Sequence, residues 1–225
     1  MQLPVEQNLP KKAVYCDFDG TITAVETFAG MLKEFAPEMS AKIMPQLYER
    51  KLTLRVGVRQ MLESIPARQY QAVIDYANDK PIRPGLTELV DFLDSKNIPF
   101  YVVSGGLRDM VIRVLSRENE ARKPLISRVA GIAAVDVDNN GEYLQVASEF
   151  EADTELVAKV RVMEKYPAKE KIAIGDSITD FNMALKADLV FARDRLIEYL
   201  ESEGKPYLPW NNFFDIRDTL AQKWQ

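Results

Sequence analysis

Four short apolar runs rich in strand-forming residues recur along the chain, and stretches with helical spacing separate them. The runs are residues 13–18 (AVYCDF), 100–103 (FYVV), 171–174 (KIAI) and 189–191 (LVF). Apolar residues recur at the spacing of an amphipathic helix within 86–93, 110–115 and 156–163. Buried strands that alternate with such helices predict a three-layer α/β sandwich around a mostly parallel, Rossmann-like sheet.

Residues 26–80 break this alternation. They contain successive amphipathic helical stretches with no clear strand, punctuated by prolines. We interpret them as a helical cap inserted into a core formed by residues 1–25 and 81–225. Within that core, residues 135–146 (VDVDNNGEYLQV) place Asn-Gly between alternating runs, which predicts a β-hairpin.

Composition narrows the function classes. The 225 residues include 29 Lys and Arg against 34 Asp and Glu, a net charge of −5, and no histidine. This balance favours a small ligand over nucleic acid or an anionic membrane, and it leaves catalysis to carboxylates, hydroxyls, lysine or arginine. Cys16 is the one cysteine, the start MQLPVEQNLPKK lacks signal-peptide features, and no apolar run approaches a membrane span. We therefore expect a cytoplasmic protein.

Polar residues follow three of the four predicted strands. Asp17 and Asp19 end the first, and residues two apart in extended chain share a side, so both carboxylates can face one pocket. An ordinary Asp-Gly turn explains the same letters. Because parallel strands place their carboxyl ends at one edge of the sheet, the three strand ends are expected to converge.

The second and third of these strand ends supply more candidates. Ser104, Gly105 and Gly106 offer a hydroxyl and approachable backbone N–H groups at a turn that opens a helix, which suits phosphate. Asp176 and Asp180 follow the third strand and share a face if a helix has begun. A plain strand-to-helix turn and a helix N-terminus rich in acids would explain the same residues without a site.

DFDGT, the serine after a hydrophobic strand, a downstream lysine and GDSITD together resemble the four motifs of the haloacid dehalogenase superfamily of phosphohydrolases. The helical insertion is similar to that superfamily's cap of the phosphoserine-phosphatase type. The resemblance spans nearly the whole chain. It implies a Mg²⁺-dependent enzyme that hydrolyses a small phosphorylated metabolite through an aspartyl-phosphate, and it leaves open whether the chain acts as a homodimer.

The resemblance also implies residue roles. Asp17 is the expected nucleophile and Asp19 the general acid and base. The side chains of Asp17 and Asp176 and the main-chain carbonyl of Asp19 are the expected metal ligands. Asp180 is expected in the second shell of the metal.

Ser104 with Gly105 and Gly106 is expected to hold the phosphoryl group, and Lys159 to offset its charge. Lys165, Lys169 and Lys171 lie nearby and could take the place of Lys159. Glu26 occupies the place of a cap glutamate that meets the substrate's amine in phosphoserine phosphatases, or else it is a solvated acid at a helix start.

The segments YVVSGG, LVFARDRL and YLPWNNFFDIRDTL resemble one branch of the superfamily, the phosphatases of methionine salvage that act on 2-hydroxy-3-keto-5-methylthiopentenyl-1-phosphate. That branch carries histidine and clustered cysteines before the third-motif lysine, whereas residues 145–159 here contain neither. Phosphoserine or another small phosphate ester therefore remains an alternative substrate. The same motifs are also compatible with a phosphotransferase and with a catalytically silent relative that binds a phosphorylated ligand.

Overall fold

A computed structural model describes residues 9–49, 51–117 and 123–224. In these parts of the chain seven strands form one sheet with the order β4-β3-β2-β1-β5-β6-β7. The strands are β1 (Lys12–Asp17), β2 (Phe100–Leu107), β3 (Gly131–Asp138), β4 (Gln145–Ala147), β5 (Glu170–Gly175), β6 (Leu189–Ala192) and β7 (Leu208–Pro209).

The α-helices of the described residues are α1 (Thr27–Phe35), α2 (Pro37–Tyr48), α3 (Leu54–Leu62), α4 (Tyr70–Asp75), α5 (Leu86–Ser95), α6 (Arg108–Leu115), α7 (Lys159–Lys165), α8 (Phe181–Lys186), α9 (Asp194–Ser202) and α10 (Phe213–Lys223). Three short 3₁₀ helices are η1 (Ala67–Gln69), η2 (Leu125–Ser127) and η3 (Ile178–Asp180).

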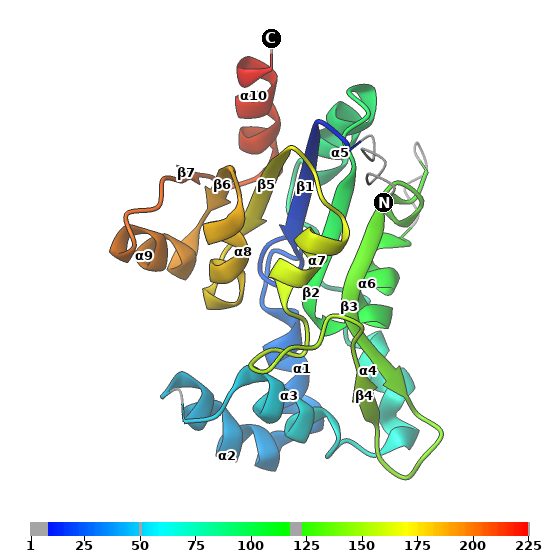
Figure 1. The fold of residues 1–225 in the computed structure, drawn as a ribbon. Helices are drawn as coiled ribbons and strands as arrows, with labels where there is room; N and C mark the ends of the chain where they lie inside the picture. The colour runs from blue at the N-terminus through cyan, green and yellow to red at the C-terminus, as the bar shows by residue number, and fades with distance from the viewer. Residues whose placement is uncertain (1–8, 50, 118–122, 225) are drawn as a thin grey trace, which may run out of the picture.

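The sheet is parallel except where β4 returns antiparallel to β3. β1 lies at its centre between β2 and β5, and Val14, Tyr15 and Cys16 are fully buried because helices cover both faces. Helices α7 and α8 lie over one face and α5 and α6 over the other, and α10 packs against α5 (Figure 1). The predicted three-layer sandwich with a mostly parallel sheet is thereby confirmed.

Helices α1, α2 and α3 pack on one another beyond the carboxyl end of β1, whereas α4 packs against α6 of the core (Figure 1). Thr53 caps α3 by accepting a hydrogen bond from the Val56 backbone, and Pro45 lies inside α2 instead of ending it. These helices occupy the stretch for which a cap was predicted. That residues 26–80 form a cap distinct from the core stays a prediction.

The structure differs from the sequence-based expectation in three places. Ser104, Gly105 and Gly106 continue β2, with a register shift against β3, and α6 begins only at Arg108, so they do not open a helix. Residues 156–158, at the start of the stretch 156–163 that was predicted to be helical, are not helical, and α7 begins at Lys159. β3 starts at Gly131, before the predicted hairpin at 135–146, and pairs first with β2 and then with β4.

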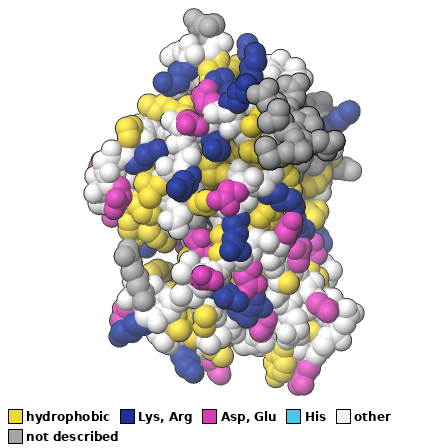
Figure 2. Space-filling view, in the orientation of Figure 1, with side chains coloured by type: hydrophobic (Ala, Val, Ile, Leu, Met, Phe, Trp, Pro, Cys, Tyr) yellow, Lys and Arg dark blue, Asp and Glu magenta, His cyan; other side chains and the backbone are white. Residues whose placement is uncertain are grey.

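Across the described residues, no helix combines the length and apolarity that a membrane span requires. The face of the molecule in Figure 2 carries lysines and arginines interspersed with acids. The first eight residues, on which the expectation about a signal peptide depends, lie outside the described part of the chain.

Candidate active site

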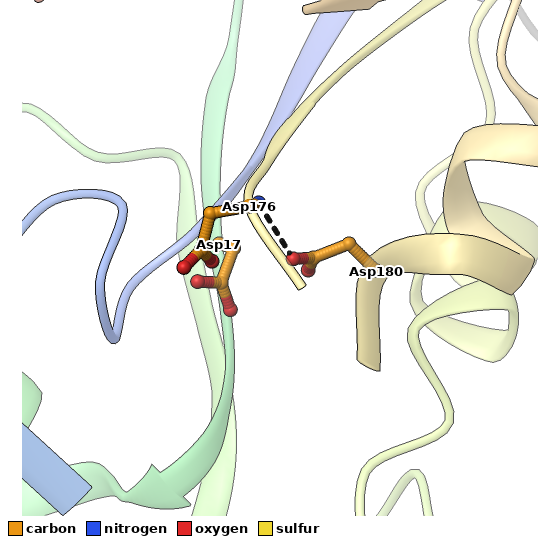
Figure 3. A group of neighbouring side chains, drawn as sticks. All are labelled: Asp17, Asp176 and Asp180. Carbon is orange, nitrogen blue, oxygen red and sulfur yellow. Dashed lines mark hydrogen bonds between the residues drawn. The ribbon is translucent and has the colours of Figure 1, made fainter. Parts of the chain in front are cut away.

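Three buried carboxylates gather where the central strands β1 and β5 end. Asp17 is the last residue of β1, Asp176 follows β5 directly, and Asp180 ends η3. β1 and β5 are parallel neighbours, so their ends lie side by side. One carboxylate oxygen from each of the three residues lies within 4.8 Å of the others, and Figure 3 shows the Asp17 and Asp176 carboxylates next to each other.

Lys159 completes this group from the start of α7. It is 2% exposed, and its Nζ donates to Asp180 Oδ1 at 2.5 Å and also to Asp17 Oδ1. The other oxygen of Asp180 accepts from the backbone N–H groups of Asp176 and Ser177, each at 3.0 Å. Asp180 is therefore fully engaged by protein donors.

Asp17 differs from Asp180 in one respect. Its Oδ2 atom is buried and has no hydrogen-bond partner. A buried, unpaired carboxylate oxygen costs free energy unless a proton or a cation satisfies it. The group therefore contains an oxygen available to a ligand, beside a second carboxylate in Asp176.

The crowding of these groups shifts their pKa values. Burial and the Asp180 carboxylate raise the pKa of Asp176 to about 7, and the same two causes raise the pKa of Asp17 well above its usual value. Burial would lower the pKa of Lys159, but the carboxylates of Asp17 and Asp180 outweigh it and raise that pKa. Lys159 therefore stays charged, whereas the acids ionise together only if more positive charge is present.

Asp19 turns toward the helical insertion. Its Oδ1 atom accepts from the backbone N–H groups of Thr27 at 2.5 Å and Phe28 at 2.9 Å, at the start of α1. Burial raises the pKa of Asp19 to about 6, although these two hydrogen bonds oppose the shift. Glu26 is exposed at the N-cap of α1, makes no side-chain cap, and lies in the cavity lining close to Asp19.

The end of β2 forms another side of the site. Gly105 and Gly106 line the cavity, and a Cβ atom on Gly105 would meet nothing within 4 Å. Ser104 is fully buried, outside the cavity lining, and its hydroxyl accepts from the Gly106 N–H at 3.0 Å. In this structure Ser104 therefore supports the glycine backbone.

The cavity above the carboxylates has a volume of about 190 Å³. Its far wall is apolar and comes from α1, α3 and the segment before α7; the wall consists of Phe28, Ala29, Leu54, Val58, Leu156 and Val157. Among the described residues that line it, Lys159 is the one cation, and Glu26 and Glu155 are further acids beside Asp17, Asp19 and Asp176.

The structure brings together the charged residues that the sequence predicted at this site: Asp17, Asp19, Asp176, Asp180 and Lys159 in its floor, and Glu26 at its edge. The sequence did not single out Thr21, whose hydroxyl donates to Asp176 Oδ1 at 3.1 Å, although Thr21 lies inside DFDGT. Glu155 and the apolar wall were also missed. Glu155, Leu156 and Val157 lie in an irregular segment with no motif, and the helical pattern of Leu54 and Val58 does not show what these side chains face.

Comparison with known proteins agrees with this geometry. The family model of haloacid dehalogenase-like hydrolases matches residues 14–185. A protein of Microcystis aeruginosa named 2-hydroxy-3-keto-5-methylthiopentenyl-1-phosphate phosphatase is 60% identical over 93% of this chain and 97% of its own length. A protein of Bacillus cytotoxicus with the same name is 31% identical over 92% of this chain and 94% of its own.

A solved structure described as a phospho-aspartyl intermediate analogue of phosphoserine phosphatase superposes with a TM-score of 0.64. It is 21% identical and covers 96% of this chain and 99% of its own, which supports the fold. The chain belongs to the haloacid dehalogenase-like hydrolases, and it is an enzyme of the phosphatase class.

Proposed function

We propose that this phosphatase hydrolyses 2-hydroxy-3-keto-5-methylthiopentenyl-1-phosphate, a reaction of methionine salvage, with Asp17 as the nucleophile. The observation that carries the choice of substrate is the cavity itself. It joins an acidic, lysine-containing floor to an apolar wall that includes Phe28, Leu54 and Val58. A phosphate ester with an apolar methylthio tail fits that division.

The cavity offers little to phosphoserine. An amino-acid phosphate presents a carboxylate, and a buried carboxylate needs a cation or several donors. Lys159 is the single cation among the described lining residues, and Asp17 and Asp180 already engage it. Glu26 could meet the ammonium group of phosphoserine, but Glu26 and Glu155 would both repel its carboxylate. The match to the Microcystis protein points to the same substrate.

Asp17 attacks phosphorus and forms an aspartyl-phosphate while the ester oxygen leaves. This covalent step divides hydrolysis into two easier displacements. Asp19, with a pKa raised to about 6, is partly protonated near neutral pH and protonates the leaving oxygen. In the second step ionised Asp19 removes a proton from the water that attacks the aspartyl-phosphate, and inorganic phosphate leaves.

The remaining residues hold the phosphoryl group. Lys159 stays charged and offsets negative charge on the transferring group, and Asp180 fixes the lysine from its other side. Gly105 and Gly106 place side-chain-free backbone against the cavity, and the Ser104 hydroxyl holds that backbone by accepting the Gly106 N–H. Lys159 is therefore preferred over Lys165, which is partly exposed and pairs with Glu149.

The residues fit Mg²⁺. An all-oxygen donor set suits this ion, and the unpaired Oδ2 of Asp17 beside Asp176 supplies two carboxylate ligands, with the main-chain carbonyl of Asp19 as a third. Asp180 would hold the neighbouring groups and would not bind the metal directly, because both its oxygens accept protein hydrogen bonds. Bound Mg²⁺ would screen the charge between the Asp17 carboxylate and the phosphate dianion and orient both.

The test is a panel of phosphate esters assayed with Mg²⁺ by phosphate release. The methylthio enediol phosphate should give the highest kcat/KM, and O-phosphoserine and acetyl phosphate should be poor substrates. A clear preference for phosphoserine would contradict the proposed substrate and leave the phosphatase class intact. Product analysis with added alcohols separates hydrolysis from phosphoryl transfer to an alcohol.

We also propose that the enzyme is located in the cytoplasm. A small metabolite as substrate and a buried free thiol at Cys16 fit a cytoplasmic enzyme. Size-exclusion chromatography with light scattering would decide between a monomer and a homodimer.

A further inference from the structure

Arg83 lies on the return from α4 to the core, outside the cavity lining, and its side chain is buried. Its Nε donates to the carbonyl of Thr21 at 2.9 Å, and its Nη2 donates to the carbonyl of Gly20 at 2.5 Å. Its backbone N–H donates to the carbonyl of Ile22 at 2.8 Å. One residue thus binds three consecutive carbonyls of the loop that follows Asp19.

The same loop holds the carboxylate of Asp176. Thr21 Oγ1 donates to Asp176 Oδ1 at 3.1 Å. Gly20 has a φ of +80°, and a Cβ atom there would lie 2.5 Å from Asp176 Oδ2. Each oxygen of this carboxylate therefore lies against a residue whose carbonyl Arg83 fixes.

Arginine suits this task for geometric reasons. The guanidinium is a rigid planar fork, so it can address two neighbouring carbonyls at once, whereas a lysine ammonium is a point charge on a flexible stem. A shift of the loop would move both contacts with Asp176 together. The position of this carboxylate thus depends on a side chain that touches neither the cavity nor the acids.

The aromatic segment near the C-terminus packs against the Arg83 side chain through Trp210. Trp210 is 3% exposed, and the Arg83 guanidinium lies 5.4 Å from its ring centroid. Phe213 packs against Trp210, and its backbone N–H donates to the carbonyl of Pro84 at 2.9 Å. Arg193 lies against the same indole ring at 5.2 Å, but its side chain donates to Asp194 and the Asn211 carbonyl, not to the loop.

We infer that Arg83, backed by Trp210, is a positioning residue that sets the Asp176 carboxylate for the divalent cation through the Gly20 and Thr21 carbonyls. The inference rests on the proposed metal site. The segment YLPWNNFF, which packs on the core and lies outside the cavity lining, would then have a function. Its Trp210 would hold Arg83 in place and so influence the metal site indirectly.

The test measures Mg²⁺ binding to the metal-free enzyme by isothermal titration calorimetry, which does not depend on turnover. Loss of an outer-shell contact weakens metal binding by about 10–100-fold, so R83M and T21V should each raise the Kd at least about tenfold. R83K should fall between R83M and the wild type, and T21S should restore binding. R193M is the matched control, because it removes the other arginine from Trp210 and should leave the Kd within about twofold.

A second readout separates positioning from a general structural defect. At saturating Mg²⁺, kcat of R83M and T21V should recover most of its loss, whereas a distorted active site would not recover. If R83M does not fold, R83K takes its place, because lysine cannot bind both carbonyls at once and should still raise the Kd, while T21V and T21S test the contact with Asp176.

Each remaining outcome has a distinct meaning. Wild-type binding that D176N abolishes but R83M and T21V leave unchanged would overturn this inference alone. No Mg²⁺ binding by the wild type would overturn the proposed metal site together with the inference.

Discussion

The floor and the wall of the cavity are built in opposite ways. The floor consists of charged side chains at the ends of β1 and β5, held by ion pairs such as the one between Lys159 and Asp180. The wall consists of half-buried apolar side chains such as Leu54 and Val58, which come from helix α3 outside the sheet. Under the proposed function, this difference means that the floor carries out the reaction and the wall selects which substrate reaches it.

The largest expected effect is on the floor. Asp17→Asn should lower kcat by roughly 10⁴-fold or more with every ester, because it removes the nucleophile. Phosphate release with Mg²⁺ measures the loss, and circular dichroism checks folding. Asp153→Asn, at an exposed position, is the control and should keep full activity. Residual activity near the wild-type rate would show that the reaction does not use Asp17.

The lysine of the floor should give a smaller loss. Lys159→Met removes a buried charge that contacts Asp17, so kcat should fall by about 10²–10³-fold. Lys165→Met lies on the same helix α7, is partly exposed, and should change kcat less than about twofold. The reverse order of the two effects would transfer the role to Lys165.

The wall should change specificity and leave the chemistry in place. Leu54→Lys places a cation beside the apolar tail, so kcat/KM for the methylthio ester should fall by about tenfold while that for phosphoserine rises. Acetyl phosphate, too small to reach the wall, should react as before. Val56→Lys lies on the same helix outside the cavity and should alter none of these values. An equal loss of kcat/KM with all three substrates would contradict the proposal that the wall sets specificity and the floor carries out the reaction.

The smallest effect concerns pH and metal. The pKa of Asp176 is raised to about 7 by burial and by Asp180, so in the metal-free protein this acid binds protons more tightly when folded than when unfolded. Its contribution to stability is therefore present at low pH and is lost as pH rises from about 4 toward 7. Mg²⁺ should raise the Tm by a few degrees more at pH 8 than at pH 5.5. Differential scanning fluorimetry measures this, and an equal shift at both pH values would contradict it.

The sequence predicted the floor better than the wall for a physical reason. Each acid of the floor lies at or shortly after the carboxyl end of a buried strand. The strand patterns in the sequence, together with the geometry of a parallel sheet, therefore predict that Asp17 and Asp176 lie close to each other. The role of Gly105 and Gly106 as strand residues was hidden, because glycine usually marks a turn. The link from Arg83 to Thr21 and Trp210 joins segments distant in the chain, and no local pattern indicates it.

The apolar wall was hidden for a related reason. Leu54 and Val58 have the spacing expected for any helix that packs on a core, and only the fold shows that they face a cavity. The boundaries of the cap, residues 26–80, stay a prediction.

The most direct test of the division between floor and wall is rapid acid quenching during turnover, followed by peptide mass spectrometry. The methylthio ester and acetyl phosphate should both leave a phosphoryl group on the peptide that contains Asp17, at different rates but at the same residue. A phosphoryl group on another residue, or turnover of either substrate with Asp17 unmodified throughout, would contradict the account.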